Sequence, residues 1–229
     1  MIRTAKSTGR IIGVLLLVQM VAGITVNFAL TAPLFESPGF LVNAAANSFQ
    51  ISLSVIIGLG LGALSVGIAI TIYPVFRQYS QAMAMWYVAL AAVGFALIAV
   101  ENTAVMSMLS LSQTYTKANG ADSELFQALK TVVGSARNWA HYINLIVGGA
   151  MGFVFYSTLF RFALVPRALA AFGMGAILLQ ITAVTMPVFG YKIVFLMLLP
   201  IALTHLAMAL WLMTKGFAEH RPLASSQHE

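Results

Sequence analysis

Cysteine and charged residues are scarce in this sequence. The chain of 229 residues contains no cysteine, which excludes disulfide bonds, thiol catalysis and metal or iron–sulfur sites held by thiolates. Only 8% of the residues are charged, whereas soluble domains carry about 25%. Hydrophobic residues make up 60% of the chain, above the range of about 45–50% in soluble domains. This composition excludes a soluble enzyme and a disordered chain, and it indicates a multi-pass membrane protein.

The sequence also lacks the motifs of known catalytic chemistries. It contains no phosphate-binding loop, no nucleophile elbow and no HExxH pattern, and the serines and threonines of the apolar runs have no adjacent base. We therefore predict no catalytic residue and favour a protein that is not an enzyme. The net charge of +6 comes from a few basic residues scattered between apolar runs. We expect the lipid bilayer, and no nucleic acid, as its partner.

Six apolar segments are long enough to cross a bilayer, which takes about 20 residues per helix. Uninterrupted apolar runs without alternation of polar residues fit helices, so the sequence predicts an all-α membrane protein with a six-span helix bundle. We expect residues 1–217 to form one transmembrane domain and residues 218–229 to form a short polar tail. The predicted spans are Ile11–Leu30, Ile51–Tyr73, Met83–Leu109, Trp139–Phe160, Leu169–Phe189 and Ile193–Thr214.

Basic residues in the loops predict the orientation of the bundle, because lysine and arginine collect in cytoplasmic loops. If the N-terminus is cytoplasmic, Lys117, Lys130, Arg137 and Lys192 lie on the far side. The larger group would lie on the cytoplasmic side, which favours two cytoplasmic termini. That group is Arg3, Lys6, Arg10, Arg77, Arg161, Arg167, Lys215 and Arg221.

The one long connection, roughly residues 110–138, lies between the third and fourth spans. Asn119 and Gly120 predict a turn within it. The residues that follow place their apolar side chains on one helical face, which predicts an amphipathic helix at the outer surface ahead of the fourth span. The apolar side chains of this face are Leu125, Phe126, Leu129, Val132, Val133 and Ala136.

Glycine pairs predict where helices approach one another. Gly58 and Gly62 in the second span form a GxxxG pattern, and Gly148 and Gly152 repeat it in the fourth. Small residues let helix backbones come close where lipid offers no hydrophobic driving force. Packing within one protomer is the expected use of these faces. A homodimer or a larger membrane complex is the alternative.

Polar residues near the outer ends of the spans form the first candidate site. An ionisable group at membrane depth costs about 2.5–3.5 kcal/mol, so it needs a partner. Glu101 lies in the outer third of the third span, and Arg137, His141 and Asn144 share one helical face at a similar depth. Two interpretations are open. These side chains build a polar outer cavity, or Glu101 pairs with Arg137 or His141 and joins the two helices.

A second polar layer is predicted deeper in the bundle. His205, Gln180 and Gln19 come out at comparable depths, and a neutral imidazole can bridge two amides. Proton or ligand handling by His205 is the alternative. His141 and His205 differ in depth by about 12 Å at roughly 1.5 Å per residue, too far to share a haem iron. Glu101 and His141 supply only two metal ligands, so we predict neither metal nor cofactor.

The sequence resembles one family along nearly its whole length. The stretches that carry the likeness are RIIGVLLLVQMVAGI, YPVFRQYSQAMAM, LSQTYTKANGADSELFQAL, FYSTLFRFALVPRALAAFG and LPIALTHLAMALWLMTKGF. They are similar to the bacterial membrane family described as domain of unknown function 4386. The resemblance implies a compact six-helix protein of the bacterial cytoplasmic membrane, and it implies no activity.

The chain departs from this family in two places. Members often carry an arginine and a glutamate in the first half of the third span, where this chain has Leu90, Ala91 and Phe95. They also carry an acidic residue in the sixth span, where this chain has His205. A charged site shared by the family would therefore be altered here.

Three classes of function follow from these features. Packed glycine faces and sparse internal charge favour a non-enzymatic membrane protein that binds a lipid, a hydrophobic ligand or a membrane-protein partner. The second class is a small proton-coupled transporter that uses Glu101, His141 and His205. The third is an intramembrane enzyme. No inverted repeat or pair of broken helices supports the transporter.

Overall fold

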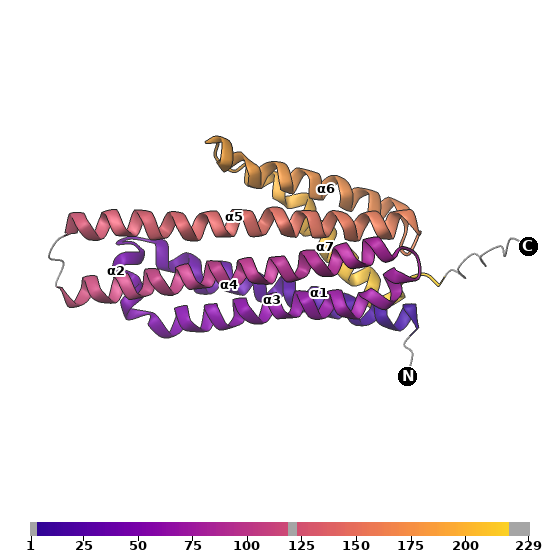
Figure 1. Cartoon of the computed structure of the whole chain (residues 1–229), viewed down its shortest axis with the longest axis horizontal. Coiled ribbons are helices and arrows are strands. Elements are labelled where there is room, and N and C mark those ends of the chain that lie inside the picture. Colours follow the sequence, from indigo (N-terminus) through magenta and orange to yellow (C-terminus); the bar gives the residue numbers. More distant parts are fainter. Residues whose placement is uncertain (1–3, 119–122, 220–229) are drawn as a thin grey trace, which may run out of the picture. The chain divides into compact units, whose positions relative to one another are not determined.

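The computed structural model describes residues 4–118 and 123–219. All secondary-structure elements of these residues are helices, and none is a strand (Figure 1). Six of the helical segments are long and apolar enough to cross a membrane. The prediction of an all-α, six-span membrane protein is therefore confirmed. The six segments are Ala5–Phe35, Ser48–Arg77, Gln81–Lys117, Glu124–Arg161, Arg167–Phe189 and Phe195–Lys215.

The first and last spans are each assembled from several helical pieces. The first consists of α1 (Ala5–Ile24), a π-helical segment η1 (Thr25–Thr31) and a short 3₁₀ helix η2 (Ala32–Phe35). The fifth span consists of α6 (Arg167–Thr185) and the 3₁₀ turn η3 (Met186–Phe189). The sixth span consists of the 3₁₀ turn η4 (Phe195–Leu198) and α7 (Leu199–Lys215). Pro33, Pro187 and Pro200 stand at the starts of three of these pieces, where a missing N–H costs little.

The middle spans are longer than the apolar runs that predicted them. Helix α3 covers Ser48–Arg77, α4 covers Gln81–Lys117 and α5 covers Ser123–Arg161. At about 1.5 Å per residue, α4 and α5 each exceed 50 Å and extend beyond a hydrocarbon core of about 30 Å. The predicted amphipathic segment forms the first turns of α5, continuous with the span. The predicted turn at residues 119–120 and residues 220–229 of the predicted tail lie outside the described residues.

The chain forms two compact units, to which α1, α3, α4 and α5 each contribute a part. Unit 1 comprises the residues up to Val18, Val66–Ala91 and the residues from Ile146 onward. Unit 2 comprises Gln19–Ser65 and Ala92–Leu145.

Several helix ends meet at one end of unit 1. Arg10 Nη2 donates to the Thr214 carbonyl at 3.3 Å, and the Ala218 N–H donates to the Leu164 carbonyl at 2.8 Å. The helix ends gathered by these bonds belong to α1, α5 and α7. Most basic residues in the described part of the unit lie at or beside these helix ends and the α3–α4 turn, namely Lys6, Arg10, Arg77, Arg161, Arg167 and Lys215. The exception is Lys192, which lies between η3 and η4.

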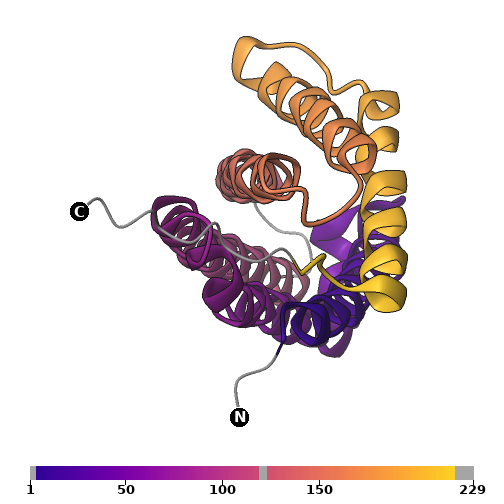
Figure 2. The same ribbon diagram turned by 90° about the vertical axis from the view of Figure 1, so that its right-hand side faces the viewer.

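Unit 1 also holds the closest helix contacts made by α5 and α6. Helices α6 and α7 lie side by side (Figures 1 and 2). A methyl group at Gly152 would lie 2.6 Å from Ile177 Cδ1, and one at Gly149 would lie 2.5 Å from Ile181 Cγ1. A methyl group at Gly148 would meet no atom within 4 Å. The close face of α5 therefore runs through Gly149 and Gly152.

Two further glycines of α6 give a matched test of this packing. A methyl group at Gly173 would overlap the ring of Tyr156, whereas one at Gly175 would meet nothing within 4 Å. Gly173→Ala should lower the free energy of unfolding by about 1–3 kcal/mol, because the buried ring has no space to move into. Gly175→Ala should be neutral or stabilise the helix by about 0.5–1 kcal/mol. Equal thermal midpoints of the two variants in detergent would contradict the close contact.

In unit 2, the second-span glycines face α4. A methyl group at Gly58 would lie 3.1 Å from Asn102 Nδ2, and one at Gly62 would lie 2.6 Å from Phe95 Cδ2. Both glycines thus let α3 and α4 approach closely. The Asn102 amide lies directly against the Gly58 backbone.

A short helix that the apolar pattern did not predict covers part of unit 2. Helix α2 (Phe40–Ala46) packs against α4 through the fully buried Ser112, whose hydroxyl donates to the Leu41 carbonyl at 2.8 Å and accepts from the Ala45 N–H at 2.9 Å. A small hydrophobic core surrounds this contact. It consists of Leu34, Phe40, Ala44, Ile51, Met108 and Leu109.

Candidate functional site

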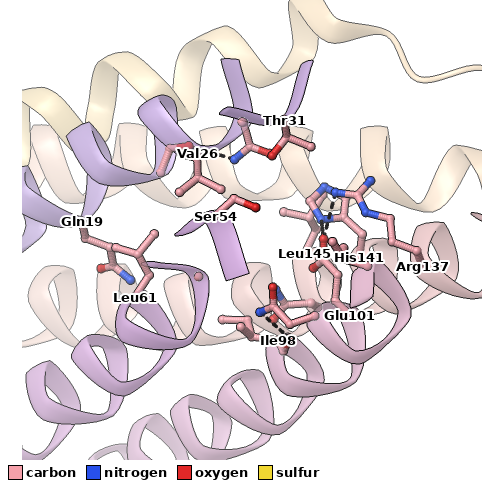
Figure 3. A pocket seen from close by; sticks show the side chains of 16 residues that line it. Gln19, Val26, Thr31, Ser54, Leu61, Ile98, Glu101, Arg137, His141 and Leu145 are labelled. Carbon is pink, nitrogen blue, oxygen red and sulfur yellow. Dashed lines mark hydrogen bonds and ion pairs between the residues drawn. The ribbon is translucent and has the colours of Figure 1, made fainter. Parts of the chain in front are cut away.

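A charged cluster in unit 2 joins α4 to α5. Glu101 of α4 makes two polar contacts through the same oxygen, Oε1: an ion pair with Arg137 Nη2 at 3.0 Å and a hydrogen bond with His141 Nδ1 at 3.0 Å (Figure 3). Arg137 and His141 lie one turn apart on α5, so both reach the same carboxylate. The side chains of Glu101, Arg137 and His141 are 14%, 18% and 27% exposed. Because the carboxylate accepts, the imidazole carries a proton on Nδ1.

These three side chains form part of the wall of a cavity within unit 2. The cavity has a volume of about 360 Å³, which falls in the range of about 300–1,000 Å³ of small-molecule sites. Helices α1, α3, α4 and α5 and the π-helical segment η1 all contribute to its lining (Figure 3). The lining residues are Gln19, Gly23, Val26, Asn27, Thr31, Ser54, Gly58, Leu61, Ile98, Glu101, Asn102, Val105, Arg137, His141, Asn144 and Leu145.

The π-helical segment η1 presents three of these residues, namely Val26, Asn27 and Thr31. Its widened turn closes with a hydrogen bond from the Ala32 N–H to the Asn27 carbonyl, and Gln50 of α3 donates to the Leu30 carbonyl at 2.7 Å. π-Helical turns are rare and are often found at functional sites. The local geometry of the first span therefore changes at the height of the cavity.

Glu101 and His141 each stand 20 residues along their own helix from the end that carries or adjoins basic residues. Counted at about 1.5 Å per residue, Glu101 is roughly 30 Å from Gln81 along α4, and His141 is roughly 30 Å from Arg161 along α5. The hydrocarbon core of a bilayer is about 30 Å thick.

The structure brings together one of the two predicted polar groups. Glu101, Arg137, His141 and Asn144 line the same cavity, and both pairings considered for Glu101 are present at once. Gln19 was predicted to lie in the deeper layer. It lines this cavity and donates to the Ser65 hydroxyl.

His205 and Gln180 belong to unit 1 and are not among the lining residues. The His205 ring lies 6.0 Å from the ring of Tyr156, centroid to centroid. Gln180 is half-buried on α6. Within the described residues, no group of three or more histidine, aspartate or glutamate side chains is arranged to hold a metal.

Sequence reasoning missed several lining residues, above all Gly23, Thr31 and Ser54. Ser54 is buried and donates to the Ile51 carbonyl at 2.7 Å. Small polar residues that bond their own helix cause little disturbance in an apolar run, so they give a weak signal. One signal could have identified these residues. Counted along their helices, they come at a depth similar to that of Glu101.

A family model described as a domain of unknown function, DUF4386, matches residues 11–216. The chain belongs to the DUF4386 family. The matched residues include all six membrane-spanning segments apart from the first turns of α1. Comparison with curated proteins and with solved structures gives no match. This DUF4386 protein is thus a multi-pass membrane protein of a family without an assigned activity.

Proposed function

We propose that this DUF4386 protein is a non-enzymatic binding protein for a membrane amphiphile, whose head group occupies the unit 2 cavity. The observation that carries the proposal is the mixed lining of this cavity. A charged cluster with side chains less than one-third exposed stands on one wall, and aliphatic side chains supply much of the remainder. These aliphatic residues are Val26, Leu61, Ile98, Val105 and Leu145.

Polar groups without protein partners support binding over simple helix pairing. An ion pair that only joined α4 to α5 would require no cavity beside it. Among the described residues, no donor reaches Glu101 Oε2, and the Asn144 amide makes no hydrogen bond, although both residues line the cavity. Neither group is sealed away from the cavity, so a ligand that pairs with them would gain hydrogen bonds.

The depth of the cavity supports an amphiphile rather than a wholly water-soluble ligand. The cluster lies about one hydrocarbon thickness from the basic helix ends, where a lipid head group meets its acyl chains. Basic residues mark cytoplasmic surfaces. We therefore place both termini on the cytoplasmic side of a bacterial inner membrane and the cavity near the opposite surface.

Native mass spectrometry of the full chain, extracted gently from its own membrane, tests this function. The expected spectrum contains the protomer with one discrete additional mass of lipid size that survives mild activation. A bare protomer under all mild conditions would contradict the proposal. A second polypeptide in place of a small molecule would contradict it as well, because the partner would then be a protein.

A further inference from the structure

We propose that the bound head group carries a primary ammonium beside a phosphate, as in phosphatidylethanolamine. This inference rests on the proposed function and specifies its ligand. Several hydrogen-bonding atoms of the cavity wall are already used by the protein, and those that remain free select the ligand.

Two asparagines of the wall leave only an acceptor free. Asn27 Nδ2 donates to the Gly23 carbonyl at 2.9 Å, and Asn102 Nδ2 donates to the Ile98 carbonyl at 2.9 Å. A backbone carbonyl can only accept, so these bonds fix which end of each amide is nitrogen. No donor of the described residues reaches either Oδ1. Each Oδ1 is therefore available as an acceptor.

Gln19 also keeps only its amide oxygen free, as the hydrogen bonds of its partner Ser65 show. Its Nε2 donates to the Ser65 hydroxyl oxygen, and the same hydroxyl donates its hydrogen to the Leu61 carbonyl at 3.1 Å. Ser65 can therefore only accept from Gln19, and Gln19 Oε1 is left over. Ser54 likewise donates to the Ile51 carbonyl at 2.7 Å, which leaves its oxygen lone pairs.

The free acceptors of the wall also include the carboxylate oxygen Glu101 Oε2 (Figure 3), and the Asn144 amide adds both an acceptor and two donors. A ligand that satisfies them must donate several hydrogen bonds. A primary ammonium supplies three donors and a positive charge, and bonds between an ionised acceptor and donor are the stronger kind. A quaternary ammonium has no N–H and cannot satisfy the same atoms.

Charge balance adds the second half of the head group. Glu101 and Arg137 already neutralise each other, and an extra cation in a poorly solvated site would be costly. Arg137 uses Nη2 on Glu101 and Nη1 on Asn138 at 3.3 Å, which leaves N–H groups of the guanidinium for a further acceptor. A phosphate is the anion that a guanidinium binds well. A head group with both charges keeps the site neutral overall.

The test compares lipids with identical acyl chains on the delipidated full-length protein in detergent, read out by native mass spectrometry. Phosphatidylethanolamine should be retained about tenfold more than phosphatidylcholine or phosphatidylglycerol, the effect of one to two net hydrogen bonds. Equal retention of the three lipids would overturn the ammonium inference and leave lipid binding intact. Retention of none of them would overturn the proposed function itself.

A soluble head group separates the two possible sources of the same chemistry. O-Phosphoethanolamine, which has no acyl chains, should be retained far less than the lipid at equal concentration. Retention equal to that of the lipid would support the ammonium site and overturn the assignment to a lipid.

A pair of neighbouring variants on α4 locates the preference. Asn102→Leu removes one acceptor of the wall and should lower the preference for phosphatidylethanolamine over phosphatidylcholine about threefold, equivalent to a fraction of one hydrogen bond. Thr103→Val, at an exposed position that does not line the cavity, should leave the preference unchanged. An unchanged preference in Asn102→Leu would contradict the role of that amide, and the comparison of lipids on the unaltered chain needs neither variant.

Discussion

Replacing Glu101 by leucine is expected to lower the free energy of unfolding by about 3–5 kcal/mol, the usual cost of removing one partner of a buried ion pair. The Arg137 side chain is only 18% exposed, so its guanidinium would lose its carboxylate while water could not fully replace it. His141 would lose its hydrogen-bond acceptor in the same variant. Reversible unfolding in mixed detergent micelles measures the effect.

The double variant Glu101→Leu with Arg137→Met separates charge from packing. It should regain most of the stability lost in either single variant, because an apolar pair of similar volume often replaces a buried ion pair without loss. Additive losses in the double variant would contradict the account. They would mean that each side chain contributes through its own packing and not through the charge pair.

Replacing Gly23 by leucine is expected to reduce the amount of retained amphiphile at least tenfold. Gly23 lines the cavity, and a methyl group there would meet no protein atom within 4 Å. The larger side chain should therefore occupy the space of the ligand without displacing a helix. Leucine is also the better helix former by roughly 0.5–1 kcal/mol, so the fold should be kept.

Gly60→Leu provides the matched control. A methyl group at Gly60 also meets nothing within 4 Å, and Gly60 is exposed and does not line the cavity. Lipid retention should be unchanged in this variant, as measured by native mass spectrometry beside Gly23→Leu. Equal loss in both variants would place the retained lipid on the outer surface of the helices and not in the cavity.

The parts of the structure that the sequence predicted are those controlled by composition and axial position. A long apolar run in a bilayer forms a helix, because a helix satisfies its own backbone hydrogen bonds, and the six spans were predicted for this reason. The joint placement of Glu101, Arg137 and His141 was also accessible, because helical spacing put two of them on one face at the depth of the third. Both are consequences of a regular rise per residue.

The features that the sequence did not predict depend on rotation about the helix axis or on tertiary contacts. Gly148 completes a sequence pattern, yet it is Gly149 that lies against α6, because the rotation of α5 is set by its neighbours. The sequence predicted the depth of Gln19 along its helix but not the side to which it points, and the structure shows that it lines the cavity. Helix α2 is too short to show a period, and its position depends on the buried hydroxyl of Ser112.

The most direct test of the account is an experimental density map of the protein crystallised from a lipid phase. The account predicts continuous density of a lipid head group within hydrogen-bonding distance of Glu101 Oε2 and the Arg137 guanidinium, with acyl chains leaving between the helices. A cavity that holds only ordered water, with Glu101, Arg137 and His141 still paired, would contradict it. The cluster would then serve to join α4 to α5 and not to bind a ligand.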